Sequence, residues 1–162
     1  MTTTTTPEPT AIRMANDASP LVLRLVLGFI FVAHGSQKLF GAFGGGGIPG
    51  TAAFFESLAV QPATLWAIAV ALVEFAGGIA LAVGFLSKIA AACIAIDMAV
   101  AVAVFNGPNG FFVETSTGGW ELNFILIAMC VSIILTGAGR YSIDHGLRPI
   151  VAKRSASLAL LV

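Results

Sequence analysis

Four long apolar stretches leave this chain of 162 residues few folds to choose from. They cover about residues 20–40, 63–86, 88–106 and 120–138, and roughly 20 helical residues cross the hydrocarbon core of a bilayer. Hydrophobic residues make up 57% of the chain and charged residues only 10%, too few to cover a fold in water. The sequence predicts an all-α integral membrane protein with a bundle of four transmembrane helices.

Composition and the positions of helix-breaking glycine and proline residues divide the chain into three parts. Residues 1–19 are rich in threonine and proline, have little to bury, and are expected to be a disordered tail. Residues 20–139 form the expected membrane domain, with glycine and proline in its connections, as in the GGGGIPG sequence of residues 44–50. Residues 140–162 are expected to be a basic and apolar cytoplasmic tail.

The positions of the charged residues predict an orientation. Lysine and arginine residues precede the first stretch, lie in the second connection and follow the fourth stretch. Glu56 and Glu114 lie in the first and third connections. Cytoplasmic segments retain positive charge, so both termini of this multi-pass membrane protein should lie in the cytoplasm. The net charge of zero argues against a nucleic-acid partner.

Polar side chains inside the apolar stretches are the candidate functional residues. A charge at the centre of a bilayer costs about 2.5 to 3.5 kcal/mol on insertion scales, so its retention there needs a reason. We expect Arg24, Asp97 and Glu121 to belong to an intramembrane polar network. At the expected depths, Arg24 can reach toward Asp97 or the cytoplasmic surface, and Lys38 can meet Glu121. His34 should lie within one or two turns of Glu74.

Small residues four apart indicate where membrane helices approach closely. Such stripes occur in the second stretch and in the third, at Ala76, Ala80 and Gly84 and at Ala91, Ala95, Ala99 and Ala103. The spacing predicts that these two helices pack together.

Several motifs occur in order along the chain. They are Arg24, the HGSQKLFG block of residues 34–41, the EFAGG block of residues 74–78, Lys88, Glu121 and the GRYSID block of residues 139–144. With these motifs, residues 20–146 resemble the DoxX family of small bacterial membrane proteins.

The resemblance implies a four-helix membrane protein associated with oxidoreductases. The family is similar to the quinone-reducing subunit of an archaeal thiosulfate:quinone oxidoreductase. Actinobacterial relatives are linked to a membrane complex with superoxide dismutase and a thiosulfate sulfurtransferase, so the resemblance implies oxidoreductase, sulfurtransferase or superoxide dismutase partner subunits. A four-helix bundle in lipid also invites a homo-oligomer.

Quinone binding suits the polar residues of the first two stretches. His34, Gln37 and Lys38 share one helix face by their spacing, and with Glu74 they offer hydrogen bonds and protons to a quinone head group. Haem, metal and dithiol chemistry fit less well, because a single histidine lies inside a stretch and Cys93 and Cys130 stand apart. We therefore predict no haem and no metal site.

Two functions remain open from the sequence. One is a membrane subunit of an oxidoreductase complex that binds quinone or supports electron or proton transfer. The alternative is a non-catalytic membrane anchor, assembly factor or small-molecule conduit, in which the polar residues only join helices.

Overall fold

The computed structural model describes residues 10–114 and 118–154, which form helices and turns without a strand. Residues 1–9 and 155–162 of the two expected tails lie outside the described residues. The long helices are α1 (Thr10–Phe40), α3 (Ala63–Val83), α4 (Ser87–Ala101) and α5 (Glu121–Thr136), and the shorter ones are α2 (Gly47–Ser57) and α6 (Ile143–Arg154). Single turns form η1 (Ala42–Gly44), η2 (Val102–Asn106) and η3 (Gly107–Asn109). The predicted all-α class is confirmed.

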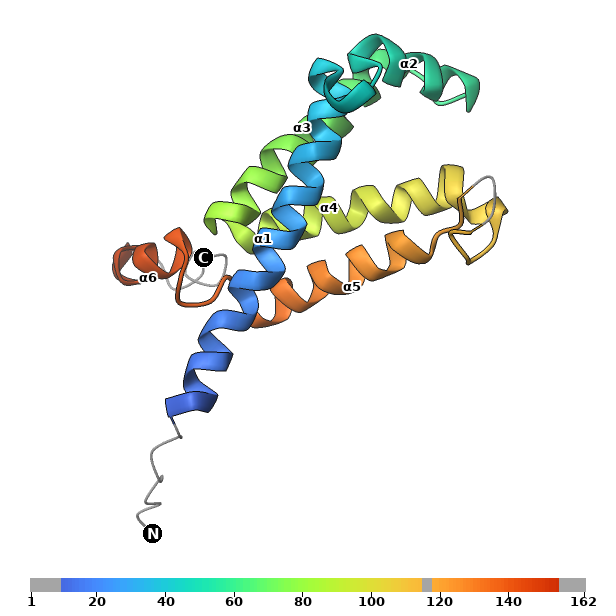
Figure 1. Ribbon diagram of the computed structural model, residues 1–162. Helices are drawn as coiled ribbons and strands as arrows, with labels where there is room; N and C mark the ends of the chain where they lie inside the picture. The colour runs from blue at the N-terminus through green and yellow to red at the C-terminus, as the bar shows by residue number, and fades with distance from the viewer. Residues whose placement is uncertain (1–9, 115–117, 155–162) are drawn as a thin grey trace.

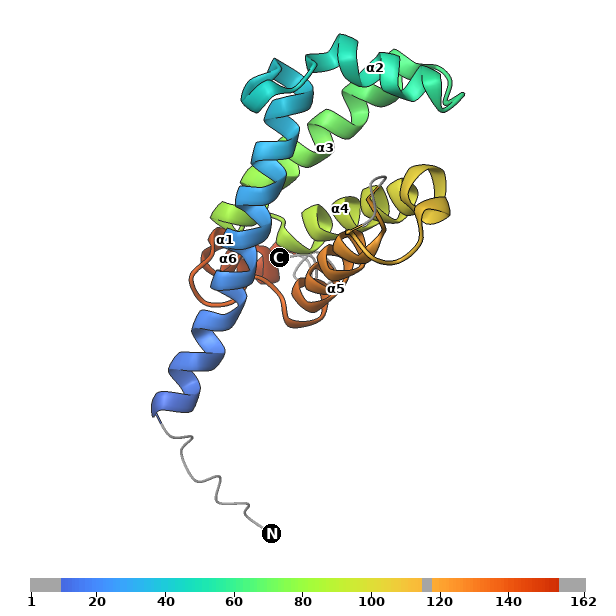
Figure 2. The same ribbon diagram turned by 45° about the vertical axis from the view of Figure 1, so that its right-hand side comes forward.

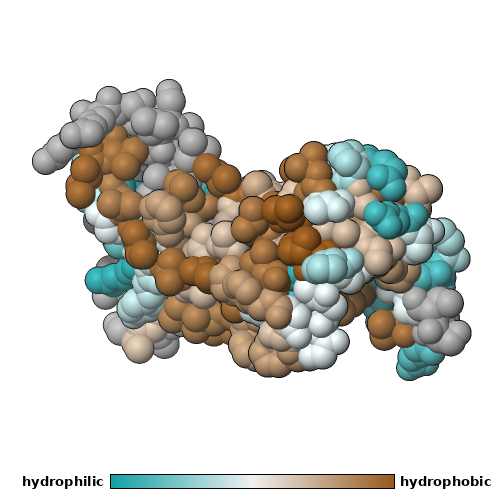
Figure 3. Space-filling model, turned by 90° about the horizontal axis from the view of Figure 1, so that it is seen from above, coloured by the Kyte–Doolittle hydropathy of each residue, from teal (hydrophilic) through white to brown (hydrophobic). Residues whose placement is uncertain are grey.

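Three segments within the described residues are long and apolar enough to cross a membrane. They are Asp17–Phe40 of α1, Ala63–Val83 of α3, and Ser87–Asn109, where α4 continues through η2 and η3. The apolar α5 has 16 residues and is therefore about 24 Å long, shorter than a hydrocarbon core of about 30 Å. Large apolar side chains such as Phe29, Ile96 and Leu135 stand exposed, and Figure 3 shows a hydrophobic surface across the middle of one face. This surface suits contact with lipid.

The helices form two pairs that diverge. α1 packs extensively along α3, and α4 packs along α5. The pairs meet near the α3–α4 connection, close to α6, and separate toward the other end, where α2 lies against α1 and α3 (Figures 1 and 2). We call these two ends the α6 end and the α2 end. α1 continues beyond the α6 end because its helix begins at Thr10, before Pro20.

Glycine brings the backbones of α1 and α3 into contact. A Cβ atom at Gly78 would lie 2.7 Å from the Val32 nitrogen and 3.0 Å from the Gly28 carbonyl oxygen. A Cβ atom at Gly35 would lie 2.4 Å from the Phe75 nitrogen. Small residues permit such an approach in membranes, where dispersion contacts and not water exclusion drive helix pairing. The α1–α3 crossing is therefore fixed by these glycines.

The expected packing of the second and third stretches through their small residues is a lesser contact. α3 packs more extensively on α1 than on α4. Ala76 of α3 and Ala99 and Ala103 at the far end of the third stretch are exposed. Alanine at four-residue spacing was therefore a weaker indication of close helix packing than the isolated glycines of α1.

A buried polar cluster ties the α6 end together. Arg24 of α1 is fully buried and its guanidinium donates to the carbonyl oxygens of Leu81 and Tyr141. Asp144 of α6 accepts from the backbone nitrogens of Leu86, at 2.7 Å, and Ser87, at 2.9 Å, and so caps the start of α4. Arg24 therefore joins α1 to α3 and to the segment before α6, in place of the expected reach toward Asp97 or the surface.

The adjacent glycines of α3 offer a direct test of the α1–α3 contact. Gly78→Ala should lower the free energy of unfolding in detergent by about 1 to 3 kcal/mol, because the new methyl group meets backbone atoms that cannot move alone. Gly77→Ala is the matched control, since its Cβ atom would meet only the Ile94 side chain, at 3.2 Å. Equal stability of the two variants would contradict the account.

Candidate functional site

A cavity of about 500 Å³ lies between the two helix pairs. Its volume is within the range of small-molecule sites, which are usually apolar with a few placed polar groups. Side chains of α1, α2, α3, α4, η2 and α5 line it, and aromatic rings are prominent among them: Phe31, Phe54, Phe55, Trp66 and Phe105. The polar lining residues are His34, Lys38, Glu74, Asp97, Asn106 and Asn123.

An ion pair joins α1 to α3 in the wall of the cavity. The Lys38 Nζ atom lies 2.6 Å from Glu74 Oε2, and the two side chains are 24% and 4% exposed. Such a buried pair loses the hydration of both charges, so it persists only with close geometry. The glycine contact between α1 and α3 supplies that geometry, because it holds the two helices at a short separation over this region.

Asp97 brings a second carboxyl group to the same cavity from α4. Its Oδ2 atom is buried and has no hydrogen-bond partner among the described residues. It also interacts electrostatically with Glu74 and Lys38. Hence three ionisable side chains from three helices meet where the two pairs begin to diverge, one basic and two acidic.

The other predicted site residues are distributed differently. His34 lines the cavity and is itself exposed. Gln37 lies outside the cavity lining, and its backbone carbonyl accepts from the Gly41 nitrogen at 3.1 Å. Glu121, expected opposite Lys38, instead accepts from the Val113 nitrogen at 3.2 Å, while Lys38 pairs with Glu74. The structure thus brings together His34, Lys38, Glu74 and Asp97.

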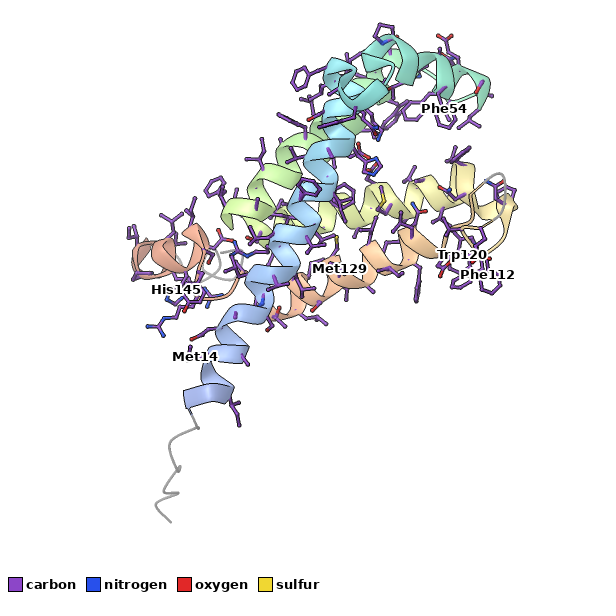
Figure 4. All side chains as sticks on the ribbon, in the orientation of Figure 1. Met14, Phe54, Phe112, Trp120, Met129 and His145 are labelled. Carbon is purple, nitrogen blue, oxygen red and sulfur yellow. The ribbon has the colours of Figure 1, made fainter. Side chains whose placement is uncertain are left out.

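Aromatic residues of α2 and η2 close one side of the cavity, a role that the sequence did not reveal. The rings of Phe54 and Phe105 meet edge to face with their centroids 5.0 Å apart. Phe54 lies on the side of α2 that faces the α4–α5 pair (Figure 4). Asn123 was also missed, although a single amide inside the apolar run of residues 121–136 was a usable signal.

The ion pair predicts a specific pattern of stability. Lys38→Met leaves the Glu74 carboxylate buried without its partner and should cost about 3 kcal/mol of unfolding free energy. Combining Lys38→Met with Glu74→Gln removes both charges and should recover most of that loss. Unfolding in detergent checks this, and a double variant whose loss equals the sum of the single losses would contradict the pairing.

Comparisons with known proteins place the chain in a family. The DoxX family profile matches residues 19–107, more than half of the chain. Over 149 residues the chain is 27% identical to an uncharacterised membrane protein of Mycobacterium tuberculosis, covering 86% of this chain and 87% of that protein. Over 124 residues it is 26% identical to a Bacillus subtilis protein named "Putative oxidoreductase CatD", covering 76% and 83% respectively. No solved structure shows significant similarity to it. The chain is a membrane protein that belongs to the DoxX family.

Proposed function

We propose that this protein is a membrane subunit of an oxidoreductase and binds a quinone-type ligand in the cavity between its helix pairs. The observation that carries the proposal is the chemical division of that cavity. Aromatic and aliphatic side chains form most of its wall, and the Lys38–Glu74 ion pair, Asp97 and His34 supply a polar region. A quinone has the complementary form, with a polar head group on an apolar isoprenoid chain.

Each polar residue has a role in the proposal. The Lys38 ammonium has three N–H donors, one of which is used by Glu74, so it can also donate to a quinone carbonyl oxygen. His34 and Glu74 can exchange protons with the head group as the quinone takes up two electrons and two protons. Gln37 lies outside the lining, so its part in binding stays a prediction from the sequence. The electrons would come from a partner subunit.

Membrane topology is part of the same proposal. We place α5 as a fourth span and both termini on the cytoplasmic side of the inner membrane. Lys88 lies in the first turn of α4, and Arg140 and Arg148 follow α5, so these basic residues gather at the α6 end, whereas Glu56 lies at the α2 end. This distribution agrees with the retention of basic residues in the cytoplasm.

The relatives are consistent with this reading. One relative carries an oxidoreductase name, and the family match over residues 19–107 includes all four ionisable residues that line the cavity. Homo-oligomers and partner subunits of the oxidoreductase, sulfurtransferase or superoxide dismutase type remain part of the proposal.

Tryptophan fluorescence can measure the proposed binding, because the chain has two tryptophans and one of them lines the cavity. A short-chain benzoquinone or naphthoquinone added to protein in nanodiscs should quench Trp66 saturably in the Trp120→Phe variant. In the Trp66→Phe variant the remaining Trp120, whose ring meets Phe111 edge to face and does not line the cavity, should show a weaker response. The Lys38→Met and Glu74→Gln double variant should weaken binding by about tenfold.

A second ion pair provides the control for this experiment. The Arg140 Nη1 atom lies 3.5 Å from Asp17 Oδ2, and neither residue lines the cavity. A double variant with Asp17→Asn and Arg140→Gln should therefore bind quinone normally. Quenching that is linear and equal for both tryptophans would contradict the proposal and favour a non-catalytic anchor, assembly factor or conduit.

A further inference from the structure

We infer that a groove between α3 and α4 holds the apolar chain of the ligand, while the head group occupies the cavity. This assignment rests on the proposed quinone site, and it adds the class of ligand, a long-chain prenyl quinone, and the side from which that ligand enters. The groove has a volume of about 170 Å³. Four residues of each helix line it: Trp66, Ala69, Val70 and Val73 of α3, and Cys93, Ile96, Asp97 and Val100 of α4.

The groove and the cavity share part of their walls. Two residues of each helix line both hollows: Trp66 and Val70 of α3, and Asp97 and Val100 of α4. The other groove residues do not line the cavity, so the groove extends beyond the cavity along α3 and α4. A ligand chain that leaves the cavity past the shared side chains therefore enters the groove directly.

The groove faces the lipid. Trp66, Ile96 and Val100 are 49%, 65% and 52% exposed, and Cys93 is exposed as well. The two helices belong to segments that are long and apolar enough to cross a membrane. An exposed apolar side chain within such a segment meets hydrocarbon. The groove consequently opens to the bilayer, where a prenyl chain is already dissolved.

The side chains of the groove suit a hydrocarbon chain. Among the described residues that line it, Asp97 alone has a carboxyl group, which belongs to the shared wall, and its buried Oδ2 atom presents no surface to the chain. Beyond that wall the lining consists of Ala69, Val73, Cys93 and Ile96. Ala69 and Cys93 are small, and small residues allow apolar groups to approach membrane helices closely. A slender apolar chain fits these walls.

The size of the cavity explains why a long chain needs a path out of it. A volume of about 500 Å³ is typical of sites for drug-sized molecules, which is sufficient for a head group but not for a long prenyl chain. The contact between the Phe54 and Phe105 rings closes the side toward α2. Lipid is as apolar as the groove, so the chain gains little free energy from burial alone. The groove instead provides a path along which the chain displaces no packed side chain.

The length of the chain distinguishes the groove from the head-group site in an experiment. Three quinones that share a head group, with no chain, a short prenyl chain and a long prenyl chain, are titrated into the Trp120→Phe protein in nanodiscs. Quenching of Trp66 gives a Kd for each quinone. Variants are compared for one quinone at a time, so that the partition of that quinone into the lipid cancels.

Two substitutions fill the groove, and each has a matched control on the same helix. Ala69→Phe on α3 and Cys93→Phe on α4 place a ring in the groove. Ala76→Phe and Ala99→Phe place the same ring at exposed alanines of α3 and α4 that line neither hollow.

The two groove variants should weaken binding of the long-chain quinone by about tenfold, because the new ring overpacks the space that the chain occupies. They should leave binding of the chain-free quinone unchanged, which also shows that the head-group site is intact. The two control variants should bind both quinones as the parent protein does.

Photolabelling tests the same assignment without a groove substitution. A long-chain quinone with a photoreactive group on the first units of its chain should label groove residues such as Val73, Cys93 and Ile96 saturably. Labelling spread over the outer faces, at residues such as Phe29 and Leu135, would show that the chain lies in bulk lipid and would reject the groove.

The remaining outcomes separate the groove from the proposed function. If the long-chain quinone binds the groove variants and the controls equally well, or if the groove variants lose the chain-free quinone to the same extent, the groove does not hold the chain. In the first of these cases the quinone site still stands. If none of the three quinones binds the parent protein, the proposed function fails together with the groove.

Discussion

The contact between the backbones of α1 and α3 is the constraint on which the rest of the structure depends. Gly28, Gly35 and Gly78 leave no space for a Cβ atom, so the two helices meet at their main chains. Because α1 and α3 are held so close, Lys38 reaches Glu74 and Arg24 reaches the Leu81 carbonyl. The α4–α5 pair contacts the α1–α3 pair mainly at the α6 end and diverges from it toward the α2 end. The cavity lies between the two pairs.

Two clusters of buried polar side chains in the described part of the chain differ in what they contact. Arg24 and Asp144 are directed to backbone carbonyl and amide groups, and they satisfy the ends of α3 and α4 as helix caps do. Lys38, Glu74 and Asp97 face a cavity, and one of their oxygen atoms has no partner among the described residues. Each cluster keeps buried atoms without a hydrogen-bond partner in the described chain, Arg24 Nε and Ser87 Oγ at the α6 end and Asp97 Oδ2 in the other cluster, so the difference between the two is that the second lines the cavity.

Much of this arrangement could be predicted from the sequence, for physical reasons that apply to particular residues. Long apolar stretches can satisfy their backbone in lipid only as helices, and charges within them mark the polar groups that must be paired. The partners were harder to predict. Depth along a helix suggested Lys38 with Glu121, but the pairing with Glu74 depends on the crossing of α1 and α3, which the glycines set in three dimensions. The cap formed by Asp144 could not be predicted either, because it also depends on long-range contact: Asp144 lies 58 positions from Leu86 and 57 from Ser87.

α2 and the aromatic residues around it also escaped the sequence reading, because a phenylalanine near a membrane boundary can face either lipid or a cavity. Contact with η2 decides the orientation of Phe54, and that contact is long-range.

The most direct test of the central claim is photoaffinity labelling of the protein in nanodiscs with a photoreactive quinone, followed by mass spectrometry of its peptides. The account predicts saturable labelling of cavity residues such as Phe54, Trp66 and Phe105, and competition by an unlabelled quinone or quinol. Labelling confined to the exposed outer faces, at residues such as Phe29, Ile96 and Leu135, without competition, would contradict it.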